Sequence, residues 1–124
     1  MNFKSLSLIS GIVLLSVSLV LLFIPSLILE FWDVNPLPEA TFMGRRISMA
    51  FLGMGLICIL ARNLPQSESR KIISVGLLIT FGSISILGFT EYFRGYAGLG
   101  IILVATFEML GAIGFYVLGV KSKT

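Results

Sequence analysis

The sequence predicts an all-α protein, an integral membrane four-helix bundle with up-down topology. Three observations support this fold class. Apolar residues make up 56% of the 124 residues and charged residues only 12%, whereas soluble domains carry roughly 25% charged residues. The apolar residues fall into four long stretches, each close to the roughly 20 residues that a helix needs to cross a bilayer. Short loops join these stretches, and such loops make consecutive helices antiparallel.

The four predicted spans belong to one domain, residues 1–124, and cover residues 6–29, 40–61, 72–90 and 98–120. The first span follows Lys4 and carries no charge from residue 5 to residue 29. This stretch is too long for the apolar region of a signal peptide, so we expect a retained first span.

The loops between the spans carry turn and capping signals. Pro38 and Glu39 are typical of a helix start and precede the second span. Residues 63–69 contain Asn, Pro and Ser, and residues 94–98 contain two glycines. Both segments are therefore predicted to be turns between antiparallel helices.

Basic residues are unevenly divided between the two sides of the predicted bundle. Under the positive-inside rule the richer side is cytoplasmic, so both termini are predicted to be cytoplasmic. Aromatic residues, which favour the headgroup level, gather on the other side at Trp32, Tyr92, Phe93 and Tyr96. The richer side has six of the nine Lys and Arg residues (Lys4, Arg62, Arg70, Lys71, Lys121 and Lys123), and the other has three (Arg45, Arg46 and Arg94).

Glu108 lies near the middle of the fourth span. A carboxylate inside a bilayer carries a large free-energy penalty unless it has a partner, a proton or a function. At about 100° per residue, Glu108 shares a helix face with Ala105, Gly111 and Ala112. Small residues of this kind are typical of helix contacts in membranes. We therefore expect Glu108 to face the interior of the bundle.

Arg45 and Arg46, about two turns inside the second span, are the natural counter-charges for Glu108. Arg46 shares a face with Ala50 and Gly53, so it is the better candidate to face inward, and Arg45 could extend toward the headgroups. In a structural interpretation, Arg46 forms a buried ion pair with Glu108 or with Glu91.

In a functional interpretation, Glu108 exchanges a proton or binds a ligand. An outward-opening cavity would then be lined by Arg46, Glu91, Tyr92, Arg94, Tyr96 and Glu108. A third alternative is a neutral Glu108 without a role. The ionisation state of Glu108 distinguishes a paired carboxylate from an exchangeable one.

Catalysis and nucleic-acid binding are not predicted, and no cofactor or metal is expected. The chain has no His, and its single Cys is Cys58. This composition excludes an internal disulfide and the usual His or Cys ligand sets for zinc, haem and iron–sulfur clusters. No nucleophile lies beside a base. The basic residues do not form the clustered polar face that nucleic-acid binding requires.

Three features resemble the DoxX-like small four-span membrane proteins of bacteria. They are a short chain made wholly of the bundle, Pro25 closing the first span, and the pattern Arg46-x-x-x-Ala50-x-x-Gly53-x-Gly55 opening the second. An acid in the last span, Glu108, adds to the resemblance. The resemblance covers nearly the whole chain. It implies a multi-pass protein of the bacterial inner (cytoplasmic) membrane, and an accessory role in a respiratory or redox membrane complex. The small multidrug-resistance transporters are less similar, because their essential glutamate lies in the first span.

The predicted function is therefore that of an accessory or assembly subunit that acts through helix–helix contacts. Its expected partners are the lipid bilayer and either another membrane protein or a second copy of the chain. The alternative is a small proton-coupled transporter, or a membrane protein that binds a lipid or small ligand, using Glu108.

Overall fold

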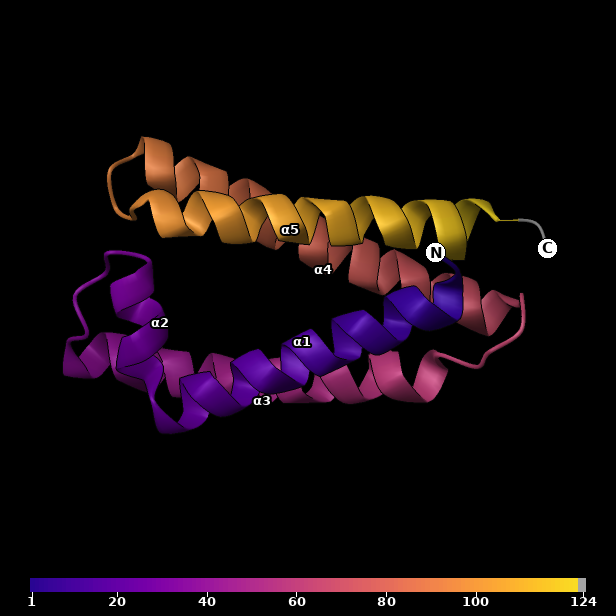
Figure 1. Ribbon diagram of the computed structural model, residues 1–124, viewed down its shortest axis with the longest axis horizontal. Coiled ribbons are helices and arrows are strands. Elements are labelled where there is room, and N and C mark those ends of the chain that lie inside the picture. The colour runs from indigo at the N-terminus through magenta and orange to yellow at the C-terminus, as the bar shows by residue number, and fades with distance from the viewer. Residues whose placement is uncertain (123–124) are drawn as a thin grey trace.

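The computed structural model describes residues 1–122, and this part of the chain is helical, without strands. Four of its helical segments are long and apolar enough to cross a membrane. The predicted all-α four-span bundle is thus confirmed (Figure 1). Lys123, which was counted in the charge distribution, lies outside the described residues. The elements are α1 (Phe3–Phe23), α2 (Pro25–Phe31), α3 (Pro38–Ala61), α4 (Glu68–Phe93), α5 (Leu99–Phe115) and a terminal π-helix, η1 (Tyr116–Lys121).

The predicted first span is divided in two at Pro25. Proline has no N–H and disfavours helical backbone at the residue before it, and Ile24 accordingly leaves the helix at φ −135° and ψ 62°. Pro25 then begins α2, which turns back toward the other helices (Figure 1). The Trp32 carbonyl after α2 accepts a hydrogen bond from the Gly98 N–H at 2.7 Å. The break therefore lets the end of α2 meet the start of α5.

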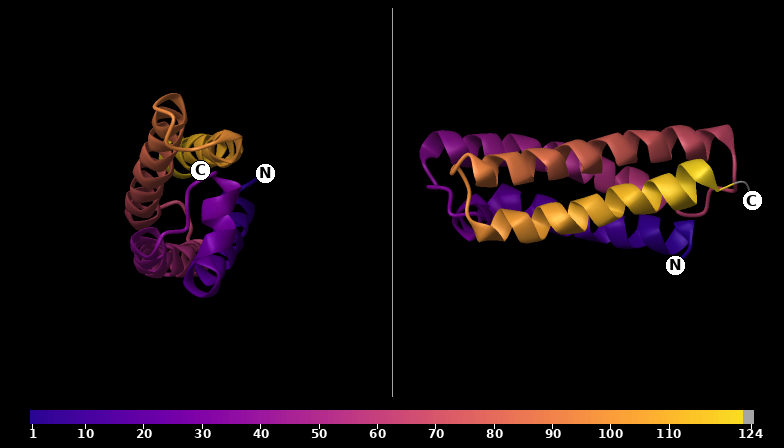
Figure 2. Two further views of the ribbon diagram at one scale, coloured as in Figure 1. Left: turned by 90° about the vertical axis from the view of Figure 1, so that its left-hand side faces the viewer. Right: turned by 90° about the horizontal axis from the view of Figure 1, so that it is seen from above.

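The long helices form two pairs, α1 with α3 and α4 with α5, and the two pairs cross at an angle (Figures 1 and 2). Glycines permit the close approach within the first pair. A Cβ on Gly11 would lie 3.0 Å from the Gly55 carbonyl oxygen, and a Cβ on Gly55 would lie 3.1 Å from the Gly11 carbonyl oxygen. In the second pair, a Cβ on Gly88 of α4 would lie 3.1 Å from the Cβ of Ala105 of α5. Small residues at these contacts are what helix association in lipid requires.

Each pair also contains one buried serine that donates a hydrogen bond to a backbone carbonyl of the facing helix. Ser18 Oγ of α1 donates to the Ser48 carbonyl of α3 at 2.8 Å. Ser85 Oγ of α4 donates to the Ala105 carbonyl of α5 at 2.6 Å. In an apolar environment a hydroxyl without a partner is unfavourable, so these bonds fix which helix faces are buried.

The apolar core between the two pairs lies toward the end of the bundle that carries the termini. There, the Phe115 ring packs edge-on against Phe3, with ring centroids 6.3 Å apart, and stacks on Phe81 at 5.9 Å. Phe115 is fully buried at the junction of α5 and η1. The buried members of this core are Phe3, Leu6, Leu14, Cys58, Leu77 and Phe115. We call this end the termini end and the opposite end the α2 end.

Candidate functional site

The two arginines of α3 point away from the rest of the bundle. Arg45 and Arg46 are both exposed, and neither side chain has a hydrogen-bond or ion-pair partner within residues 1–122. Arg46 lies eight residues after Pro38, about 12 Å along the helix axis at 1.5 Å per residue. The structure therefore places two cations on the outer surface of a membrane-spanning helix, one of them about two turns from its end.

Ser48 explains this orientation. Its side chain is fully buried, and its Oγ donates to the Arg45 carbonyl at 2.5 Å while its own carbonyl accepts from Ser18 of α1. A helix turns by about 100° per residue, so Arg46 lies about 200° from Ser48. The inward face of α3 therefore passes through Ser48, Gly55 and Cys58. Arg46, Ala50 and Gly53 do share a face of α3, but that face is exposed and does not point inward as expected.

Glu108, unlike the exposed arginines of α3, lies close to a face of its helix that packs against another helix. It lies between Ala105 and Ala112, which pack against α4, and it is seven residues before the core residue Phe115. The side chain is partly buried, and its Oε2 is inaccessible and accepts no hydrogen bond. A carboxylate oxygen in these surroundings has lost water without gaining a donor. Glu108 is therefore an acid whose surroundings within the chain do not satisfy it.

The remaining predicted site residues gather around the α4–α5 loop. Glu91 and Arg94 form an ion pair at 3.2 Å, with 59% of the Arg94 side chain and 29% of the Glu91 side chain exposed. The Arg94 guanidinium also lies 5.0 Å from the centre of the Tyr96 ring. Tyr92 contacts Phe93 edge-on at 5.5 Å. These contacts are local to one helix end, and exposed pairs of this kind contribute little to stability.

The structure does not bring the predicted ion-pair partners together. Within residues 1–122, the single ion pair is Glu91–Arg94, so Glu91 does not pair with Arg46. Glu108 and Arg46 are separated because α3 and α5 occupy diagonal corners of the bundle (Figure 2). The expected pair was based on the positions of the two residues along their helices, and those positions do not determine which helices are neighbours.

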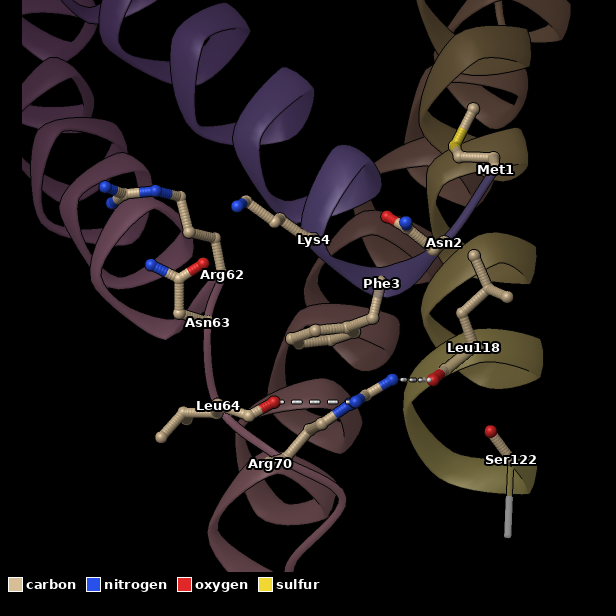
Figure 3. A pocket seen from close by; sticks show the side chains of 10 residues that line it. All are labelled: Met1, Asn2, Phe3, Lys4, Arg62, Asn63, Leu64, Arg70, Leu118 and Ser122. Atoms are coloured by element: carbon tan, nitrogen blue, oxygen red, sulfur yellow. Dashed lines mark hydrogen bonds between the residues drawn. The ribbon is translucent and has the colours of Figure 1, made fainter. Parts of the chain in front are cut away.

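Arg70 is the residue that the sequence-based site prediction missed. Its Nη2 donates to the Leu118 carbonyl of η1 at 2.7 Å, and its Nη1 lies 3.5 Å from the Leu64 carbonyl of the α3–α4 loop. Its guanidinium carbon is 3.9 Å from the centre of the Phe3 ring of α1 (Figure 3). One side chain of α4 thus contacts segments from the other three spans. Free carbonyls at helix C-termini attract cations, and this signal was available at Arg70 because α3 and the last span both end on this side.

Neither a metal centre nor a known family emerges from the described chain. Residues 1–122 contain no group of three or more His, Cys, Asp or Glu side chains that could hold a metal ion. Comparisons with protein-family models, curated proteins and solved structures yield no match. The resemblance to DoxX-like proteins therefore stays a prediction.

Proposed function

We propose that the chain acts through helix–helix contacts as an accessory or assembly subunit of a complex in the bacterial inner membrane. The observation that carries this proposal is the outward-facing Arg46 of α3. An arginine on a lipid-facing helix surface is unfavourable, and such residues usually pair with another group. No acid of the described chain pairs with Arg46. A carboxylate at a similar depth on a helix of another protein would supply the missing charge.

The surface around Arg46 supports the same proposal. Ala50, Gly53 and Ile57 follow Arg46 on one face at helical spacing, and all four residues are exposed. No atom lies within 4 Å of the position that a Cβ on Gly53 would occupy. Small residues permit the close backbone approach by which helices associate in membranes. We call this surface, made of Arg46, Ala50, Gly53 and Ile57, the Arg46 face.

Photo-crosslinking in native membranes tests this proposal. A benzophenone maleimide would be attached to Gly53→Cys, in a Cys58→Ala background that removes the only other thiol. Adducts of defined mass are expected, and Arg46→Leu should abolish them. The matched control is Ile79→Cys, because Ile79 of α4 is 63% exposed but lies on another helix. Identical adduct patterns from positions 53 and 79 would rule the proposal out. An adduct of twice the chain mass would identify a second copy as the partner.

A transporter or ligand-binding protein that uses Glu108 is the second candidate function. The buried and unpaired Glu108 Oε2 favours it, because an acid of this kind can exchange a proton or accept a hydrogen bond from a ligand. Infrared difference spectroscopy of the wild type against Glu108→Gln, across a pH range, tests this candidate. A protonated acid that titrates near neutral pH supports exchange. A carboxylate that is already ionised well below pH 6 indicates a hidden partner and contradicts it.

The proposed orientation has its own test. Reporters fused after residue 124 and within residues 66–69 should both read cytoplasmic, since the basic residues favour that side. A periplasmic signal at either position would reverse the orientation without affecting the helix contacts.

A further inference from the structure

A cavity of about 460 Å³ lies at the termini end, between the start of α1, the end of α3, the start of α4 and η1. Its volume falls within the range of small-ligand sites, roughly 300–1,000 Å³. Three cationic side chains line it, those of Lys4, Arg62 and Arg70, and its lining contains neither Asp nor Glu (Figure 3). The cavity is therefore strongly positive and suited to an anion.

Arg70 forms a fixed wall of this cavity. Its hydrogen bonds go to neutral backbone carbonyls and its guanidinium stacks on Phe3. These contacts hold the side chain in place, but they leave its positive charge without an anion. The Arg70 Nε is buried and makes no hydrogen bond. Arg70 is thus an oriented cation whose charge is not neutralised within residues 1–122.

Lys4 and Arg62 complete the positive cluster from two other helices. Both residues line the cavity together with Arg70 and Asn63. In Figure 3 the Lys4 side chain extends toward α3, whereas the Arg62 guanidinium points away from that of Arg70, which points toward Leu118. Lys4 has no partner among residues 1–122, and Arg62 uses its Nη1 to donate to the Ile59 carbonyl at 2.5 Å. Neither cation forms an ion pair within the described chain. A bound anion would supply the negative charge that the lining of the cavity lacks.

We propose that this cavity binds an anionic phosphate group. Phosphate oxygens accept charge-assisted hydrogen bonds from both ammonium and guanidinium groups, and the Asn63 amide can add a neutral donor. The cavity lies at the end of the apolar helices, where lipid headgroups are found, and basic pockets at this level suit anionic phospholipids. Leu8 and Ile12 lie above Lys4 on the same face of α1 and are 36% and 52% exposed, so an acyl chain could follow them.

A melting experiment on the intact chain tests the proposal. Cys58 is the only cysteine and is fully buried, so a thiol-reactive fluorogenic dye reports unfolding without an added probe. Dioleoylphosphatidylglycerol is expected to raise the melting temperature by about 5 °C relative to dioleoylphosphatidylcholine at equal mole fraction. Phosphatidylcholine should raise the melting temperature less, because its choline group would add a further cation to the positively charged cavity. Inorganic phosphate is compared with chloride at equal ionic strength.

Variants distinguish binding in the cavity from nonspecific attraction of the anionic lipid to surface charge. Lys4→Gln removes an exposed cation that has no partner within residues 1–122, so it should leave the ligand-free melting temperature unchanged and lose more than half of the phosphatidylglycerol shift. Arg62→Gln should lose a similar share. Lys71→Gln is the matched control, because Lys71 is an exposed cation of α4 outside the cavity lining, and it should keep the full shift.

The outcomes are distinct. A shift with phosphatidylglycerol alone assigns a lipid headgroup, and an equal shift with inorganic phosphate assigns a soluble phosphate. Equal melting temperatures in both lipids, together with no effect of inorganic phosphate, would overturn the proposal. Equal losses in Lys4→Gln and Lys71→Gln would do the same, since they would indicate nonspecific attraction.

Discussion

Arg70 and Arg46 both belong to helices that are long enough to cross a membrane, but they lie at opposite ends of the bundle in opposite surroundings. Arg70, at the termini end, reaches carbonyls of the α3–α4 loop and of η1. Arg46, toward the α2 end, is exposed, and its side chain has no hydrogen-bond or ion-pair partner in the described part of the chain. The last carbonyls of a helix have no intrahelical partner, whereas carbonyls in a helix interior are already used. A cation can therefore be satisfied within the chain near helix ends, and it needs an external partner elsewhere.

The same contrast separates the two halves of the molecule. The termini half contains the aromatic core around Phe115 and the shared contacts of Arg70. The α2 half contains the outward-facing Arg46 and, near its boundary, the unpaired Glu108 Oε2. We infer that the termini half contributes most of the packing that stabilises the bundle, beside the proposed anion site, and that the α2 half carries the side chains available for contacts with another protein. Four predictions test this division.

Removal of the Arg70 side chain should produce the largest loss of stability. Arg70→Ala eliminates a charged hydrogen bond and a cation–π contact, and we expect a loss of about 3 kcal/mol in the free energy of unfolding. Arg70→Lys should recover only part of it, because an ammonium lacks the planar fork of donors. Dye labelling of Cys58 during unfolding in one detergent measures both. The adjacent exposed cation provides the control, Lys71→Ala, and a loss as large in that variant would refute the role of Arg70.

Close packing of the termini half predicts the second effect. A Cβ on Gly119 of η1 would overlap Ser74 Oγ and Cβ of α4, so Gly119→Ala should cost about 2 kcal/mol. Gly76 is also in this half, but a Cβ there would meet no atom within 4 Å. Gly76→Ala should therefore be neutral or stabilising by up to about 1 kcal/mol. Equal unfolding free energies for the two variants would contradict the packing of η1 against α4.

The sequence predicted the fold well because lipid imposes a strong length and composition signal. All four spans were found. The largest boundary difference is at α1, which ends at Phe23 and not at residue 29, and α4 extends beyond the predicted 72–90 to Glu68 and Phe93. The break at Pro25 was the main architectural difference. A proline inside an apolar stretch can close a helix or only bend it, and composition alone does not distinguish the two.

The site was harder to predict because it depends on which helices are neighbours. The sequence located Glu108 and Arg46 along their helices, but it did not determine that α3 and α5 are diagonal (Figure 2). It also favoured the small residues Ala50 and Gly53 as the inward face of α3. The Ser48 carbonyl, which accepts from Ser18 of α1, and the glycine contact at Gly55 determine that face instead. Helical periodicity identifies the residues that share a face, but the choice between two faces rich in small residues requires the packing partner.

Glu108 provides the third prediction, an increase in stability on removal of the charge. Its buried Oε2 has no donor, so Glu108→Leu should stabilise the isolated chain by about 1 kcal/mol. Glu108→Gln should give a smaller gain, since the amide keeps polar atoms in the same place. The measurement is unfolding followed by Cys58 labelling. A clear loss of stability in Glu108→Leu would mean that the carboxylate has a partner inside the bundle and does not belong with the unsatisfied groups.

The smallest effect on stability is expected at Arg46. Its side chain contacts no polar group of the chain, so Arg46→Leu should change the unfolding free energy of the isolated chain by no more than about 0.5 kcal/mol. The same substitution should abolish the crosslinks from position 53 in native membranes, because it removes the charge that a partner carboxylate would meet. A residue that matters only within the membrane and not in the isolated chain acts through something outside that chain. If Arg46→Leu instead destabilises the isolated bundle as strongly as Arg70→Ala, the two arginines have the same role and the division of the molecule fails.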